Sequence, residues 1–209
     1  ITDSVTSTGL TEFINNNLGG EHYRFKRGYR NVINEQIRLQ SEGVNCPLAI
    51  ETSGHAAFRE NYYLDDGAYL ITKIIIKAAI LRKEMKYIGD CIENLKKPIE
   101  EKELRFNITS EDFRPIGEAL IEKIKVLAEN DSDMILAPDN YEGIRVSFKD
   151  ENRNGWFLLR LSVHDPVMPF NTESDSVGGC VEICKTFYEI VKDVKDIDFT
   201  PLKDFIKIQ

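Results

Sequence analysis

The segment Glu51-Thr-Ser-Gly-His55 brings together side chains that could bind and react with a hydroxylated molecule. It places a carboxylate, a hydroxyl and an imidazole on one turn. A carboxylate accepts hydrogen bonds from sugar hydroxyls, a serine donates or accepts, and a histidine holds or moves a proton near neutral pH. The same residues are also compatible with a capped turn that holds a hydrogen-bonded histidine.

Two further segments could bind an anion. Arg24-Phe-Lys-Arg-Gly-Tyr-Arg30 has four basic residues in seven, in a chain whose net charge is −8. It follows an expected strand and opens an expected helix, where backbone N–H groups favour anions. Arg160-Leu-Ser-Val-His-Asp-Pro166 offers a guanidinium fork and a hydroxyl to a phosphate. The alternatives are a solvated charge run for the first segment and a strand end before an Asp-Pro turn for the second.

The residues around the first two segments alternate between expected strands and helices. Residues 1–4 resemble the end of a strand that runs into a loop, so we expect the chain to lack its natural N-terminal part. Short strands are expected over 22–25 and 47–50, and helices over 9–18, 30–39 and 66–82. This alternation predicts an α/β unit with a largely parallel sheet. Ligands of such sheets bind at the C-terminal ends of strands, which favours the loop after Ile50 as a binding site.

The pattern changes after a charged stretch that contains Pro98, and we expect a linker over 96–103. Beyond it, strands are expected over 104–108, 134–137, 143–148, 156–162 and 168–173, and helices over 111–128 and 176–194. Strands grouped between two helices predict an α+β unit, with a smaller antiparallel four-stranded sheet and two helices on one face. The expected organisation is therefore an α/β domain over 1–95 followed by an α+β domain over 104–209.

Composition narrows the class of protein. The chain has 209 residues, of which 42% are hydrophobic and 30% charged, as in soluble globular proteins. Its acidic balance argues against a nucleic-acid or anionic-membrane binder, because both need a broad positive surface. The most apolar stretch, 71–81, is too short to span a membrane and predicts a buried or amphipathic helix. The first residues lack the features of a signal peptide, and we expect a cytoplasmic protein.

The cysteines give no sign of a disulfide framework or a metal site. Cys46, Cys91, Cys180 and Cys184 include no CxxC pair, so reduced thiols are expected. Cys180 and Cys184 share one face of an expected helix, but a zinc site would need two more ligands in a chain with three histidines. No metal site is predicted.

Taken together, the motifs resemble the C-terminal half of the α-D-phosphohexomutases, the phosphomannomutase/phosphoglucomutase family. The family's sugar loop, Gly-Glu-x-Ser-Gly-His, is matched by residues 50–55, with Ile50 in place of the glycine. An Asp-Asp-Gly motif follows at 65–67, and the family's Lys-x-Gly loop is matched at 26–28. Segments 138–145 and 155–160 also look like this family.

The family's phosphate loop, Arg-x-Ser-x-Thr-Glu-Pro, is matched by residues 160–166. Val163, His164 and Asp165 depart from its pattern, so this loop could have a different shape. By resemblance, Glu51 and Ser53 bind sugar hydroxyls, whereas the distal phosphate is bound by Arg160, Ser162 and His164. Lys26 is then an electrostatic partner and His55 a proton carrier near the reaction.

The resemblance also implies a fold and an activity. The fold is most of an α/β/α layered domain 3, truncated at its N-terminus, followed by domain 4. The activity interconverts hexose 1-phosphate and hexose 6-phosphate, of mannose or glucose, through a phosphoserine and a bisphosphorylated sugar.

The family's phosphoserine and Mg²⁺ loops have no counterpart here. The resemblance therefore implies that missing N-terminal domains of the same protein bind Mg²⁺ and that this fragment alone is inactive. Expected partners are a hexose phosphate and those domains, with no nucleic acid and no membrane. The alternative is a non-catalytic phosphosugar-binding or interaction module.

Overall fold

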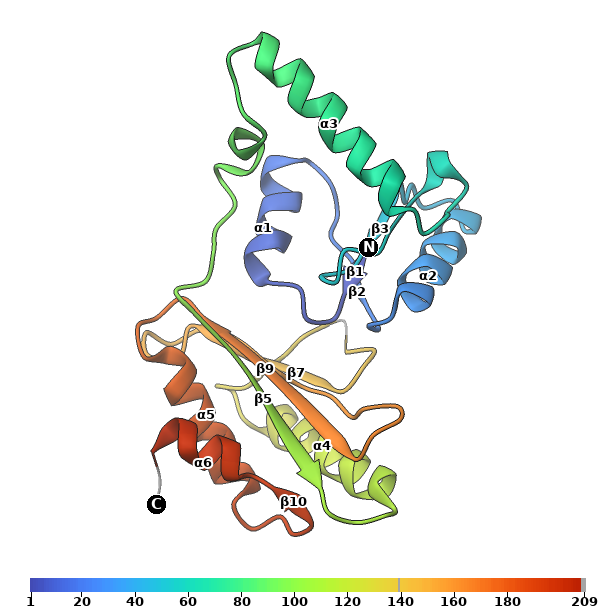
Figure 1. The fold of residues 1–209 in the computed structure, drawn as a ribbon. Coiled ribbons are helices and arrows are strands. Elements are labelled where there is room, and N and C mark those ends of the chain that lie inside the picture. Colours follow the sequence, from blue (N-terminus) through green and yellow to red (C-terminus); the bar gives the residue numbers. More distant parts are fainter. Residues whose placement is uncertain (139, 208–209) are drawn as a thin grey trace. The chain divides into compact units, whose positions relative to one another are not determined.

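A computed structural model describes residues 1–138 and 140–207. Asp139, which belongs to the segment 138–145, and the last two residues of the chain lie outside the described residues. The chain divides into two compact units, Ile1–Lys97 and Pro98–Gln209, and each has its own sheet (Figure 1).

The first unit is a mixed sheet with helices. Its elements are β1 (Thr2–Asp3), α1 (Thr8–Asn17), β2 (Arg24–Phe25), α2 (Tyr29–Ser41), β3 (Leu48–Ile50), β4 (Ala56–Phe58), the 3₁₀ helix η1 (Arg59–Asn61), α3 (Gly67–Lys83) and the 3₁₀ helix η2 (Ile88–Ile92). The strand order is β2-β1-β3-β4. Strand β1 is parallel to both of its neighbours, and β4 pairs antiparallel with β3. The α/β class expected from the sequence is confirmed.

Helices α1 and α2 lie on opposite sides of the strands (Figure 1). The strand order explains this, because the chain moves along the sheet in one direction from β1 to β2 and in the other from β2 to β3. Since βαβ crossovers are right-handed, the reversal puts the second helix on the other face. The loops that follow β1, β2 and β3 therefore share one edge of the sheet.

Helix α3 begins within one residue of its predicted start, but its apolar stretch, expected to be buried or amphipathic, is largely exposed. The Asp66 carboxylate caps it by accepting a hydrogen bond from the backbone N–H of Tyr69 at 2.9 Å, which lowers the pKa of Asp66. Within this helix, Leu81 is the buried residue, whereas Ile71 is 58% and Ile75 62% exposed. Helical spacing predicts the helix, but burial depends on what packs against it.

The second unit is an antiparallel sheet with three α-helices in the described residues. Its elements are β5 (Glu100–Ile108), α4 (Phe113–Asn130), β6 (Ile135–Leu136), β7 (Ile144–Phe148), β8 (Gly155–Leu159), β9 (Val167–Ser174), α5 (Gly179–Val191), β10 (Ile197–Asp198) and α6 (Thr200–Ile206). The strand order is β10-β5-β9-β8-β7-β6, and every pair is antiparallel.

Three expectations about this unit need correction. The sheet has six described strands rather than four and is larger, not smaller, than that of the first unit, because β10 and the two-residue strand β6 within the expected strand 134–137 extend its edges. The tail forms a third helix, α6, where two helices were expected. Residues 100–103 are not linker, since they pair with β9 as the start of β5. The charged run Glu-Glu-Lys-Glu is therefore the start of a strand whose polar side chains are largely exposed, not part of a linker.

The core lies on one face of this sheet, against the helices (Figure 1). Along β9, buried and half-buried residues alternate, as expected when one face of a sheet is covered. The rings of Phe106, Phe157, Phe170 and Phe187 are fully buried. The Phe170 and Phe187 ring centroids are 4.6 Å apart, which joins β9 to α5.

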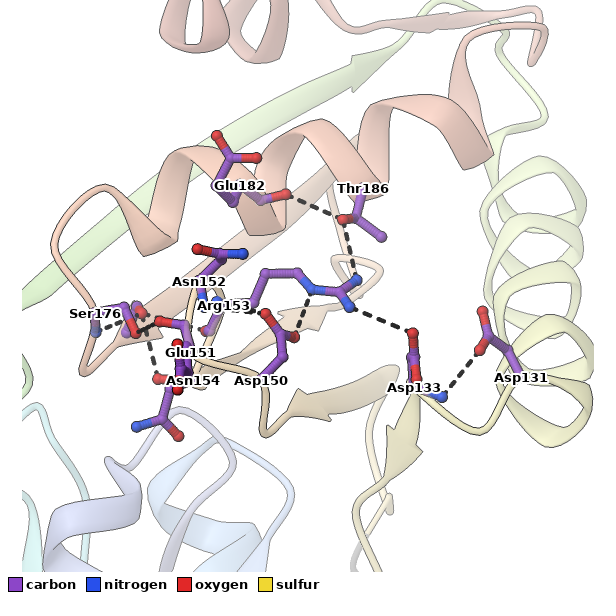
Figure 2. A network of polar contacts seen from close by, with 11 residues as sticks. Asp131, Asp133, Asp150, Glu151, Asn152, Arg153, Asn154, Ser176, Glu182 and Thr186 are labelled. Atoms are coloured by element: carbon purple, nitrogen blue, oxygen red, sulfur yellow. Dashed lines mark hydrogen bonds and ion pairs between the residues drawn. The ribbon is translucent and has the colours of Figure 1, made fainter.

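An arginine braces the turn between β7 and β8. Figure 2 shows the Arg153 guanidinium donating to Asp150 at 2.7 Å and to the Thr186 hydroxyl at 3.4 Å, with the Asp133 carboxylate 3.6 Å away. The same guanidinium stacks on the ring of Phe148. Because each guanidinium nitrogen has a contact within the protein, Arg153 has a structural role.

None of the helices in residues 1–138 and 140–207 is long and apolar enough to cross a bilayer.

Candidate functional site

The segment 51–55 is the tight connection between β3 and β4. The Glu51 backbone N–H donates to the carbonyl of His55 and the Gly54 N–H donates to the carbonyl of Glu51, both at 2.9 Å. Gly54 has φ +93°, a conformation that L side chains rarely adopt, which explains the glycine in the motif. The turn lies at the C-terminal end of β3, where the sequence places a binding loop.

The structure brings this sugar loop together with the loop after β2. The Gly28 N–H donates to Oε1 of Glu51 at 2.5 Å, and the Ser53 hydroxyl donates to Oε2 at 3.2 Å. The Glu51 carboxylate therefore lies at the N-terminus of α2, where an anion is favoured, and is only 7% exposed. Two segments predicted separately thus form one polar cluster.

The basic residues of the second loop have different roles. Arg24 turns into the fold and donates to the carbonyls of Thr6 and Ser7, so it is structural. Lys26 is exposed and donates no hydrogen bond within the described part of the chain. Its ammonium group is therefore available to a ligand.

His55 is held on two sides. Its Nδ1 lies 2.7 Å from Oδ2 of Asp65, and its ring stacks on Tyr29 with centroids 4.9 Å apart. Oδ1 of Asp65 also accepts from the backbone N–H of Ala56 at 3.2 Å. A carboxylate next to Nδ1 favours the tautomer in which Nδ1 carries the proton, which leaves Nε2 as an acceptor.

In the second unit, Arg160 follows β8 and is 8% exposed. Its Nη1 donates to the Glu142 carboxylate at 3.1 Å, and its Nε is buried without a hydrogen-bond partner among the described residues. A buried donor without an acceptor raises the free energy of the folded protein. An anion that accepted from this guanidinium would remove part of that cost.

Ser162 organises the loop after Arg160. Its hydroxyl oxygen accepts from the backbone N–H groups of His164 at 3.4 Å and Asp165 at 3.2 Å, which leaves the hydroxyl proton for another acceptor. The His164 side chain is exposed and has no polar contact within the described residues. The Ser162 hydroxyl therefore orders the loop two residues after Arg160, whereas the His164 side chain is held by no described polar contact.

Sequence reasoning missed Tyr29 and Glu142, which contact predicted site residues across the fold. One signal for Glu142 is its neighbour Gly143, which has φ +66°. A Cβ at Gly143 would lie 2.1 Å from the carbonyl oxygen of Leu159, so only glycine allows this approach of β7 to β8. That approach puts Glu142 beside Arg160.

The described residues include no group of three or more His, Cys, Asp or Glu side chains that could hold a metal ion. All four cysteines are free. Burial raises the pKa of the Cys180 thiol to about 11 and that of Cys184 to about 12, so both are poor nucleophiles and poor metal ligands.

Comparison with known proteins gives consistent results. Residues 1–97 match the family model for phosphoglucomutase/phosphomannomutase, alpha/beta/alpha domain III. A phosphomannomutase/phosphoglucomutase of Pseudomonas putida is 28% identical over 160 residues, covering 76% of this chain and 30% of that protein. A solved phosphoglucomutase/phosphomannomutase family protein from Burkholderia thailandensis has a TM-score of 0.67 at 24% identity, covering 93% of this chain and 37% of that one. An N-acetylphosphoglucosamine mutase of Aspergillus fumigatus, solved in complex with glucose 1,6-bisphosphate, has a TM-score of 0.55 at 12% identity, covering 92% and 38%.

The fold is thus that of a phosphohexomutase domain 3, a mixed sheet with helices, followed by domain 4, an antiparallel sheet with helices. The chain is thus similar to a C-terminal part of phosphoglucomutase/phosphomannomutase proteins, and residues 1–97 carry the match to their domain III. It spans about a third of the length of these relatives, 30% of one and 37% of another.

Proposed function

We propose that this chain is the substrate-recognition part of a phosphohexomutase. The complete enzyme would interconvert hexose 1-phosphate and hexose 6-phosphate, of mannose or glucose, through a phosphoserine and a bisphosphorylated sugar. The observation that carries the proposal is the cluster of Glu51, Ser53 and Gly28, in which two motifs typical of the family meet.

In this proposal the first unit binds the sugar. Each carboxylate oxygen of Glu51 accepts one hydrogen bond from the protein and has a second lone pair for a sugar hydroxyl. The Ser53 oxygen can accept another. A mutase must hold its sugar in two orientations. The oxygens of Glu51 and Ser53 can accept hydrogen bonds from hydroxyls in either orientation, which suits this task better than a donor with one fixed direction.

The second unit binds a phosphate. The Arg160 guanidinium has an Nε–H without an acceptor among the described residues, and Ser162 offers its hydroxyl proton. Glu142 neutralises the Arg160 charge when no phosphate is present. His164 is a further donor that would become ordered on binding.

Lys26 and His55 are assigned to the reacting end of the substrate. The exposed Lys26 ammonium stabilises negative charge, and Nε2 of His55 accepts or returns a proton of a sugar hydroxyl.

The described residues do not fit a Mg²⁺ site, so the magnesium ion implied by the family resemblance is assigned to other domains of the protein. We therefore expect the isolated chain to have no mutase activity. Conversion of glucose 1-phosphate to glucose 6-phosphate by the purified 209-residue chain would contradict this.

The phosphate assignment is tested by measuring the affinity of the chain for glucose 6-phosphate by titration calorimetry. Arg160→Ala should weaken binding about ten- to a hundredfold, because each hydrogen bond to a charged group contributes about 1.5–3 kcal/mol. Arg160→Lys should restore only part of the affinity, since it keeps the charge without the fork.

Arg153→Ala is the matched control, because it removes an arginine from the same unit whose guanidinium is already occupied. It should lower stability but leave the affinity within about twofold of the parent, measured at a temperature where both are folded. Equal losses in the two variants, or no loss in Arg160→Ala, would show that Arg160 does not bind the phosphate.

A further inference from the structure

A buried carboxylate lies next to the sugar loop and has no part in the proposed function. Asp3, on β1, is 0% exposed. The Thr6 hydroxyl lies 3.1 Å from its Oδ1 and 2.6 Å from its backbone carbonyl oxygen. Thr52 donates to its Oδ2 twice, from the backbone N–H at 3.2 Å and from the hydroxyl at 2.7 Å. Within the described residues, Asp3 forms no ion pair.

Burying a charge without a counter-ion is unfavourable, and hydrogen bonds from neutral donors offset only part of that cost. A smaller or apolar side chain at this position of β1 could be buried at a lower cost in free energy. The carboxylate is therefore best explained by the group that it holds in place.

That group is the middle of the sugar loop. Thr52 stands between Glu51 and Ser53, and both of its hydrogen-bond donors are directed at one oxygen of Asp3. Thr52, Ser53 and Gly54 are exposed, and the other hydrogen bonds described for them lie within the turn, from the Ser53 hydroxyl and the Gly54 N–H to Glu51. Asp3 thus fixes from β1 a loop that lies 49 positions later in the sequence.

The loop has a second anchor on its other side. The Gly28 N–H holds Oε1 of Glu51, while Asp3 holds Thr52. With both anchors in place, the carboxylate of Glu51 and the hydroxyl of Ser53 remain side by side. Loss of the Asp3 anchor would remove the contact that ties the middle of the loop to β1, while the pairing of β3 with β4 would still hold its two ends.

We propose that Asp3 is a positioning residue that acts through Thr52 to hold Glu51 and Ser53 in the arrangement that binds sugar hydroxyls. The ligand in this inference rests on the proposed function, but the anchoring can be measured without any ligand.

Thr52→Val tests the inference with little risk to the fold, because Thr52 is exposed whereas Asp3→Ala would empty a buried position. In the 209-residue chain, Thr52→Val should speed amide hydrogen exchange at 52–54 about tenfold. It should weaken binding of glucose 6-phosphate about three- to tenfold and leave the affinity for inorganic phosphate unchanged. Thr52→Ser keeps the hydroxyl and should restore both measurements.

The possible results separate the two proposals. If Thr52→Val leaves hydrogen exchange at 52–54 within about twofold of the parent, Asp3 does not position the loop. The same conclusion follows if Thr52→Ser behaves like Thr52→Val. If exchange responds as expected but the parent chain does not bind glucose 6-phosphate, the anchoring stands and the proposed function fails.

Discussion

At the scale of single residues, the contacts of His55 predict which of its two ring nitrogens carries the proton. Oδ2 of Asp65 lies 2.7 Å from Nδ1, so the neutral ring should carry its proton on Nδ1 and present a bare Nε2. Asp65→Asn replaces an acceptor with an amide that can donate to Nδ1, which should move the proton to Nε2.

The ring nitrogen chemical shifts of His55, measured by ¹⁵N NMR with the ring neutral, report this directly. Asp66→Asn is the matched control, since it changes the neighbouring carboxylate, which caps α3 and does not contact His55. The expected result is a tautomer change in Asp65→Asn alone. Identical ring nitrogen shifts in all three proteins would show that Asp65 does not set the tautomer.

Sequence reasoning at this scale finds residues that belong to local motifs. Glu51, Ser53 and Arg160 stand in segments whose residue types by themselves indicate binding chemistry. Tyr29 and Glu142 could not be found in this way, because their roles come from contacts with residues 26 and 18 positions away. Arg24 is the opposite case, a residue that the sequence suggests for anion binding but that has another role. Its side chain turns inward and donates to backbone carbonyls.

At the scale of elements, Glu100 connects two parts of the second unit. Its carboxylate accepts from the backbone N–H of Gly178 at 2.6 Å and from that of Cys180 at 3.1 Å, and so caps the N-terminus of α5 from β5. Glu100→Ala should lower the free energy of unfolding by about 1–2 kcal/mol, measured by urea denaturation. Glu101→Ala, on the exposed side of the same strand, should change it by less than about 0.5 kcal/mol. Equal effects would contradict the cap.

Helix α5 also protects two thiols. Burial raises the pKa of Cys180 to about 11 and of Cys184 to about 12, so almost no thiolate is present at pH 8. Iodoacetamide at this pH should label the exposed Cys91 first and should label the two helix cysteines only in denaturant. Mass spectrometry of the alkylated peptides checks this order. Labelling of Cys184 as fast as Cys91 in the native protein would show that α5 opens readily.

Most helices and strands could be predicted from the sequence, but strand β10 could not. Helical spacing predicts α1 to α5 within a few residues, because each has a repeating apolar pattern. The two-residue strands β2 and β6 lie within the expected strands 22–25 and 134–137, whereas the two residues of β10 contain no repeat. Strand β10 forms because the adjacent long strand β5 offers hydrogen bonds at its edge.

At the scale of the whole molecule, the two units differ in how much they bury. A hydrophobic cluster that includes Phe106, Phe157 and Phe170 lies entirely within the second unit. Most of the buried apolar side chains described in the first unit are small, such as Ala49, Ala56 and Ala57. Because stabilisation grows with the apolar area buried, the second unit should be the more stable of the two.

Differential scanning calorimetry of the chain should therefore show two transitions, with the first unit unfolding at the lower temperature. A chain of residues 98–209 should keep the upper transition alone. A single transition in the full chain, lost when the first unit is removed, would show that the two units fold as one.

The central claim is that the first unit binds sugar hydroxyls and the second binds phosphate. It is tested most directly by following backbone amide resonances of the 209-residue chain during titration with glucose 6-phosphate and, separately, with inorganic phosphate. The account predicts that glucose 6-phosphate shifts the amides of residues 26–28, 51–55 and 160–164, whereas phosphate alone shifts those of 160–164. If glucose 6-phosphate leaves the amides of 51–55 unchanged at saturation of the phosphate loop, the sugar loop does not bind the sugar and the account is wrong.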